Sequence, residues 1–313
     1  MKSKSFTGTL AVLALSAGLT ACGTSGQGSN SSAGSTSNTA ANQTTGSTGA
    51  KTGSKGTVKI GYVTWTEDVA DVYLWKHLLE QRGYKVQLTN MQAGPLWLGL
   101  SKGGIDFHFD VWLPHTDKTY MNKYKSSLVN LGKWYQGKTR IGLVVPQYVK
   151  INSISQLNAH SKEFGNRIVG IDAGAGETQT IEKKVIPAYG LKLKLVNSSS
   201  PAMLSALKSA YAKHKPIVVA LWSPHWAFSK WKLKYLKDPK GAFGKPGWIQ
   251  TEANKKWAAQ HPTVVKWLKN FKLNQQQLGE LEVDINDAKT KDAGVTKWIQ
   301  SHKSLVNSWF QTS

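Results

Sequence analysis

Residues 107–114 read Phe-His-Phe-Asp-Val-Trp-Leu-Pro, and residues 217–224 read Ile-Val-Val-Ala-Leu-Trp-Ser-Pro. The first run alternates apolar and polar side chains, as in a half-buried strand. The second begins with five apolar residues, a pattern typical of a strand that is buried on both faces. Each strand pattern leads directly into a tryptophan, Trp112 or Trp222. Both runs therefore predict a strand of an α/β sheet that places a large aromatic ring at its end.

Outward from these two runs, strand and helix patterns alternate along the chain. In the first half, strand patterns lie at 58–63, 86–88, 105–111 and 140–145, and helical patterns lie at 67–82 and 95–100. The alternation restarts with strand patterns at 167–172, 191–196 and 217–221, and helical patterns at 178–188 and 201–213. Beyond about Asp238 the pattern is mainly helical, at 262–271, 274–283 and 293–310. The sequence predicts two α/β units with a helical C-terminal portion that packs back on the first.

The beginning of the chain has the features of an export signal. Lys2 and Lys4 precede a mostly apolar stretch, 10–19, that is too short to span a bilayer comfortably and ends in Leu-Thr-Ala-Cys22. This ending resembles the bacterial lipobox, in which the peptidase cuts before the cysteine and a lipid is attached to its sulfur. Residues 1–22 are therefore predicted to be a lipoprotein signal peptide, with Cys22 lipidated at the outer face of the cell membrane. An ordinary signal peptide with an incidental thiol is the alternative.

The segment after Cys22, residues 23–56, consists almost entirely of small and polar residues. It has too few apolar side chains to offset the entropy of an ordered chain, so it is predicted to be a disordered Gly/Ser/Thr linker. The residues from 57 onward are enough for two domains or one large one, and for a substantial core. Since Cys22 is the only cysteine of the chain, an intramolecular disulfide is excluded.

The formal net charge is +22, with 40 Lys and Arg against 18 Asp and Glu. Nucleic-acid binding would be one explanation, with tryptophans as stacking platforms. The lysines, however, are spread along the mature chain, and an exported protein rarely meets nucleic acid. We expect a solvated basic surface, attracted to anionic lipids or wall polymers, and no nucleic-acid partner. An adhesin that used this charge would lose affinity steeply with added salt.

Trp65, Trp112 and Trp222 share one position, beyond the carboxyl end of a predicted strand. Ligands of open α/β sheets bind at that edge. Three aromatic faces suit a trimethylammonium group, which donates no strong N–H hydrogen bond and gains about 0.5–2 kcal/mol from each face. Burial in the core is the alternative for these three. It is the favoured interpretation for the tryptophans within helical patterns, namely Trp75, Trp97, Trp257, Trp267 and Trp298.

The Gly174-Ala175-Gly176 turn lies between a predicted strand and a predicted helix. Its backbone N–H groups suit a ligand carboxylate, although a tight turn that needs glycine explains it equally well. No dinucleotide fingerprint, H-E-x-x-H or G-x-S-x-G motif is present, and the only thiol is Cys22. We therefore expect no catalytic residue, no metal site, no cofactor and no enzyme activity. A carbohydrate-binding lipoprotein remains an alternative, because tryptophans also stack on sugars.

Five longer motifs carry a family resemblance. They are Tyr-Val-Thr-Trp at 62–65, Ala-Gly-Pro-Leu-Trp at 93–97, Asp-Val-Trp-Leu-Pro at 110–114, Gly-Ile-Asp-Ala-Gly-Ala-Gly at 170–176 and Trp-Ser-Pro-His-Trp at 222–226. In this order they resemble the glycine-betaine-binding lipoproteins of osmoprotectant ABC importers, from about Lys59 to the C-terminus. The resemblance implies delivery of a small quaternary-ammonium ligand to an ABC permease complex in the membrane.

The resemblance also implies a fold and a site. The fold would be α/β, two-lobed and periplasmic-binding-protein-like (type II), with residues 57–142 plus 233–313 as one lobe, residues 143–232 as the other, and a hinge between them. Trp65, Trp112 and Trp222 would form a cage around the quaternary ammonium. The backbone N–H groups of Gly176 and Glu177 would hold the ligand carboxylate.

One departure from the family pattern affects the carboxylate half of this site. Family members often read Trp-Leu-Pro-x-Thr-His, and the histidine helps to bind the carboxylate, whereas here the matching position is Asp117. An aspartate repels a carboxylate unless it is protonated or points away. His115, two positions earlier, is the candidate substitute, and Glu177 is more polar than the residue often found there. Glycine betaine is the expected ligand, with carnitine or choline as alternatives.

Overall fold

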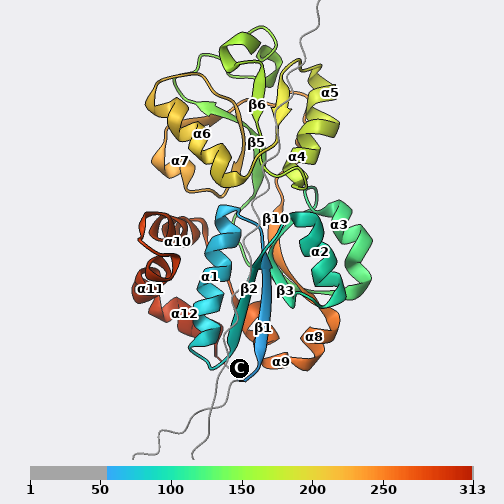
Figure 1. Ribbon diagram of the computed structural model, residues 1–313, viewed down its shortest axis with the longest axis vertical. Coiled ribbons are helices and arrows are strands. Elements are labelled where there is room, and N and C mark those ends of the chain that lie inside the picture. The colour runs from blue at the N-terminus through green and yellow to red at the C-terminus, as the bar shows by residue number, and fades with distance from the viewer. Residues whose placement is uncertain (1–54, 312–313) are drawn as a thin grey trace, which may run out of the picture. The chain divides into compact units, whose positions relative to one another are not determined.

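Two five-stranded sheets organise the chain in the computed structural model, which describes residues 55–311 (Figure 1). The first sheet has the strand order β2-β1-β3-β10-β4, and the second has the order β7-β6-β8-β5-β9. The strands are β1 (Thr57–Tyr62), β2 (Lys85–Asn90), β3 (Phe107–Leu113), β4 (Leu128–Lys133), β5 (Arg140–Pro146), β6 (Arg167–Val169), β7 (Lys194–Val196), β8 (Val219–Ser223), β9 (Leu233–Tyr235) and β10 (Trp248–Asn254). The predicted signal peptide, Cys22 and nearly all of the predicted linker lie outside the described residues.

Helices cover both faces of each sheet, which confirms the predicted α/β class (Figure 1). They are α1 (Thr66–Glu80), α2 (Ala93–Lys102), α3 (Lys118–Tyr124), α4 (Gly176–Thr180), α5 (Ile186–Tyr189), α6 (Ser200–Ala212), α7 (Ala227–Lys230), α8 (Lys255–Gln260), α9 (Pro262–Asn270), α10 (Gln275–Asp287), α11 (Lys291–Ser301) and α12 (Lys303–Trp309). Helices α10 and α11 pack against α1, as expected for a C-terminal portion that returns to the first unit. None of the helices between residues 55 and 311 is both long and apolar enough to cross a bilayer.

The strand and helix patterns are largely confirmed, with differences at some ends. The predicted helix at 178–188 is one helical run in which a π-helical turn, Ile181–Val185, joins α4 to α5. The predicted helix at 293–310 is divided into α11 and α12 at His302. Of the five tryptophans expected in the core, four are buried and Trp267 is half-buried against the core.

The sequence patterns missed β10, a central strand of the first sheet. This segment was expected to belong to a mainly helical region, but it lies antiparallel between β3 and β4. Gln250 and Glu252 interrupt the apolar pattern that is expected of a buried strand. They are buried all the same, because they form hydrogen bonds inside the sheet. Gln250 Nε2 donates to Glu252 Oε1 at 2.6 Å, and Asn130 Nδ2 donates to the same oxygen at 2.9 Å. A register shift between Gln250 and Glu252 further breaks the alternation.

Two segments, residues 134–139 and 236–247, connect the two sheets. They pair with each other through an antiparallel bridge between Thr139 and Gly247, in which Gly247 N also donates to Thr139 Oγ1 at 3.1 Å. The second sheet includes residues 140–142 and 233–235, which the predicted lobe boundaries assign to the first lobe. The division into lobes stays a proposal, and these paired segments are its natural hinge.

Half of the acidic residues are buried, although the protein is strongly basic. Within residues 55–311, nine of the 18 Asp and Glu are buried, and no lysine or arginine is. The buried carboxyls are Glu67, Asp68, Asp71, Asp106, Asp110, Asp117, Glu177, Glu252 and Glu282. Burial raises the pKa of each of them, because a carboxylate loses its hydration in the interior. The exposed surface is therefore even more basic than the composition indicates.

These carboxyls predict that the protein is more stable in mild acid than in mild alkali. Glu67 and Asp117 have pKa values raised to about 7, and Glu177 to about 8, by burial. The folded state thus binds protons more tightly than the unfolded state, so stability rises as the pH falls through 8 and 7 towards the ordinary carboxyl range. Buried His108 and His225, with pKa values lowered by burial to about 4 and about 3, oppose this below about pH 6.5, but they are outnumbered.

We expect the urea midpoint of the folded domain to be higher at about pH 5 than at about pH 8. Urea is the suitable denaturant because it adds no ionic screening. A midpoint that falls steadily from pH 8 to pH 5 would show that the buried carboxyls do not dominate the proton balance.

Candidate functional site

The three strand-end tryptophans meet in one pocket, although they come from three different strands. Trp65 lies between β1 and α1, Trp112 lies near the end of β3, and Trp222 lies near the end of β8. All three are buried, with 7%, 5% and 2% of their surface exposed. The lining of this tryptophan pocket consists of Trp65, Glu67, Trp112, Thr116, Asp117, Ile141, Ile171, Ala175, Gly176, Glu177 and Trp222. The pocket therefore combines residues from both sheets, with the three tryptophans at or beyond the carboxyl ends of β1, β3 and β8.

Each of these tryptophans donates its indole N–H to a carboxyl group. Trp65 Nε1 donates to Asp172 Oδ2 at 3.3 Å. Trp112 Nε1 donates to Asp110 Oδ1 at 2.5 Å, and Trp222 Nε1 donates to Glu67 Oε2 at 2.8 Å. Such an acceptor offsets the cost of burying the indole N–H, and the bond restricts the rotation of the ring.

Two of these indole bonds connect the two sides of the pocket. One is donated from the side of the first sheet and the other from the side of the second. Trp65 follows β1 of the first sheet and bonds to Asp172, which follows β6 of the second. Trp222 in β8 of the second sheet bonds to Glu67 in α1, which packs on the first. The arrangement of the rings therefore depends on the closeness of the two sheets.

The glycine turn of the second sheet touches the loop that follows β3. A Cβ atom added to Gly176 would lie 2.1 Å from the carbonyl oxygen of Thr116, so only glycine fits there. Nearby, Tyr120 Oη donates to the carbonyl oxygen of Gly174 at 3.0 Å. These contacts place the first turn of α4, with Gly176 and Glu177, at the wall of the tryptophan pocket.

Three carboxyl groups line the tryptophan pocket, and no lysine, arginine or histidine among residues 55–311 does. Asp117 Oδ2 accepts a hydrogen bond from the backbone N–H of Trp112 at 2.7 Å. Glu177 Oε1 accepts one from the backbone N–H of Gly142 at 3.1 Å, and its Oε2 is buried with no hydrogen-bond partner among the described residues. Glu67 is the third. The pocket is thus aromatic on one part of its wall and acidic on another.

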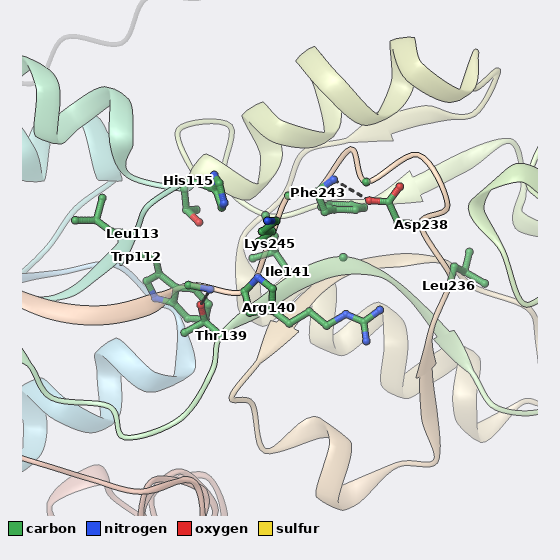
Figure 2. A pocket seen from close by; sticks show the side chains of 16 residues that line it. Trp112, Leu113, His115, Thr139, Arg140, Ile141, Leu236, Asp238, Phe243 and Lys245 are labelled. Atoms are coloured by element: carbon green, nitrogen blue, oxygen red, sulfur yellow. Dashed lines mark hydrogen bonds between the residues drawn. The ribbon is translucent and has the colours of Figure 1, made fainter.

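His115 is the one predicted ligand residue that the structure does not place in the tryptophan pocket. It is exposed and lines an adjacent cavity of about 240 Å³, which also contains Arg140 and Lys245. Figure 2 shows these three side chains around the adjacent cavity, with Trp112 at one end. The other five predicted residues line the tryptophan pocket, so the structure brings them together and leaves the role of His115 a prediction.

The sequence patterns did not identify several other lining residues. Glu67 entered the sequence analysis only as the first residue of the helical pattern at 67–82, although its position two residues after Trp65 was the available signal. Asp117 was noted only as a departure from the family pattern. Ile141 and Ile171 lie at strand ends and have no feature that separates them from core residues.

Comparison with known proteins identifies the family. Residues 56–301 match the family model described as the substrate binding domain of ABC-type glycine betaine transport systems. The glycine betaine/carnitine transport binding protein GbuC of Listeria monocytogenes is 35% identical over 151 residues, which cover 47% of this chain and 50% of that relative. The match therefore spans about half the length of this curated relative.

Two solved structures are similar over most of the chain. Lactococcal OpuAC, in its closed conformation with glycine betaine, has a TM-score of 0.76 and 35% identity, covering 82% of this chain and 99% of its own. The glycine betaine/L-proline-binding protein ProX of Borrelia burgdorferi has a TM-score of 0.75 and 32% identity, covering 81% and 96%. These structures confirm the expected type II periplasmic-binding-protein fold. The chain therefore belongs to the family of substrate-binding domains of ABC-type glycine betaine transport systems, which are transporter components and not enzymes.

Proposed function

We propose that this protein captures glycine betaine, or a related betaine, in the tryptophan pocket and delivers it to an ABC importer for osmoprotection. The observation that carries the proposal is the convergence of Trp65, Trp112 and Trp222 on one pocket, each with its indole N–H bonded to a carboxyl oxygen. A trimethylammonium group has no N–H to donate, so it binds through the electron-rich faces of aromatic rings.

The other end of the ligand would meet the first turn of α4. The backbone N–H groups of Gly176 and Glu177 are the proposed donors to the ligand carboxylate, and both residues line the same pocket as the tryptophans. Because Gly176 lies against Thr116 of the first sheet, the donors reach the pocket only while the two sheets are close.

Ligand entry would require the sheets to separate. The bonds of Trp65 to Asp172 and of Trp222 to Glu67 cross between them and would break on opening. The hinge proposed above, residues 134–139 and 236–247, would permit this rotation. The closed, ligand-bound form would then dock on the permease. Attachment through a lipidated Cys22 would keep the protein at the outer face of the membrane.

A choline- or carnitine-preferring protein of the same type is the second candidate. The observation that favours it is the acidic wall formed by Glu67, Asp117 and Glu177, which suits a cation better than a zwitterion when these groups are ionised. Calorimetric titration with glycine betaine, carnitine, choline and proline separates the candidates. Binding of none of these ligands would refute the osmolyte function.

Removing one wall of the cage should weaken binding. We expect Trp112→Ala to reduce the affinity for glycine betaine by about 1–3 kcal/mol, or about 5- to 150-fold, in calorimetric titration. Trp267→Ala is the matched control, because Trp267 is half-buried outside the pocket and contacts Arg82 and Phe310. Full affinity in the Trp112 variant would show that this ring is not part of the cage.

Blocking the contact of the glycine turn should also weaken binding. In Gly176→Ala, the new methyl group would collide with the Thr116 carbonyl and hold the two sheets apart, so we expect a loss of affinity of more than about tenfold. Gly279→Ala in α10 is the control, since a Cβ there meets no atom within 4 Å. If both variants bind glycine betaine equally well in calorimetric titration, the turn does not hold the ligand.

A further inference from the structure

Among residues 55–311, no positive side chain lines the tryptophan pocket to meet the carboxylate of a betaine. The groups that face it are Glu67 from α1, Asp117 from the loop after β3 and Glu177 from α4. Asp110 and Asp172 do not line the pocket but accept the indole N–H groups of Trp112 and Trp65. The basic side chains of this region line the adjacent cavity instead; they are His115, Arg140 and Lys245 (Figure 2).

We propose that Asp117 and Glu177 are protonated when a betaine binds, that each donates an O–H hydrogen bond to its carboxylate, and that their protonation selects a zwitterion over a simple cation. This inference rests on the proposed function of the pocket and adds the residues that determine its specificity. Asp117 would then supply a hydrogen-bond donor at the position where the family often has a histidine.

The hydrogen bonds within the protein leave one oxygen of each carboxyl group to hold the proton. Glu177 Oε1 accepts from Gly142 N, so its partnerless, buried Oε2 is the atom that would carry the hydrogen. Asp117 Oδ2 accepts from Trp112 N, which leaves Oδ1 for the same purpose. Both side chains are almost completely buried, with 3% and 2% exposed, so water cannot screen them well.

The alternative state, with both groups ionised, would repel the ligand carboxylate. Two added negative charges in a buried pocket that lacks a basic side chain destabilise a third one. The same charges attract a quaternary ammonium ion that has no carboxylate, such as choline. The pKa values, raised by burial to about 7 for Asp117 and about 8 for Glu177, place the change between these two states in the range from mild acid to mild alkali.

The first test is calorimetric titration of the wild-type protein with glycine betaine and with choline at about pH 5 and about pH 9. We expect the Kd for glycine betaine to rise at least about tenfold from the lower to the higher pH. The Kd for choline should stay constant or fall. Circular dichroism at each pH verifies that the protein remains folded. A glycine betaine Kd that does not change with pH would overturn the proposal.

Proton uptake provides a second measurement that needs no variant. At about pH 8, part of the Asp117 and Glu177 population is ionised, so binding of glycine betaine should take up protons from the buffer. The observed heat should therefore depend on the ionisation enthalpy of the buffer, and choline should show no uptake. Equal proton uptake for both ligands would contradict the proposed role of the ligand carboxylate.

Variants assign the effect to the two residues. Asp117→Asn and Glu177→Gln place an N–H donor in the pocket at every pH, so the double variant should bind glycine betaine with much less pH dependence than the wild type, the remainder coming from Glu67. Glu252→Gln is the matched control, because Glu252 is equally buried but bonds to Gln250 and Asn130 outside the pocket. It should keep the wild-type pH dependence.

The outcomes separate this inference from the function on which it rests. A double variant that keeps the full wild-type pH dependence would overturn the assignment to Asp117 and Glu177. Tight binding of glycine betaine that is independent of pH would overturn the inference alone and support the proposed function. Absence of binding for both ligands at every pH would overturn both.

Discussion

An indole N–H that is buried without an acceptor costs free energy, and carboxyl oxygens remove this cost for the three tryptophans of the candidate site. Trp65, Trp112 and Trp222 bring three large rings to the ends of strands, where each would otherwise leave an unsatisfied donor. Carboxyl oxygens satisfy all three, so the rings have a fixed orientation and their faces remain available to a ligand. Two of the acceptors, Asp172 and Glu67, lie on the side of the sheet opposite to the tryptophan that they bind. The orientation of Trp65 and Trp222 therefore depends on how closely the two sheets approach.

The same acceptor role accounts for two of the nine buried carboxyls of this basic protein. Carboxyls such as Glu67 and Asp110 serve as acceptors for neutral N–H donors and have no buried lysine or arginine as partner. An ionised pair would be anchored by Coulomb attraction, whereas these groups sit in an environment that favours their neutral form. Charge is thereby divided, with cations on the surface and neutral or weakly acidic groups within. The formal net charge counts the surface cations and the buried carboxyls together and does not show that they are separated.

The sequence was sufficient for the class of fold and for the aromatic half of the site, because both depend on local patterns. The strand runs predicted Trp112 and Trp222 at strand ends, and in the structure both rings line one pocket. The acidic half was beyond reach, since the burial of Glu67 and the partners of Glu177 arise only from contacts between distant segments. His115 was selected for its chemistry alone, and the backbone turns it towards another cavity. Strand β10 was missed because its buried polar residues, Gln250 and Glu252, interrupt the apolar pattern by which a buried strand is identified.

Strand β10 has a consequence for the order in which the chain can fold. Strand β4 is at the edge of the first sheet and pairs with β10 alone. The entire second sheet is encoded between these two strands, so during synthesis β4 has no partner until that sheet has been made. The second sheet needs no residue beyond Tyr235 and can assemble before the first is complete. The first sheet can therefore be completed only after the whole second sheet has been synthesised.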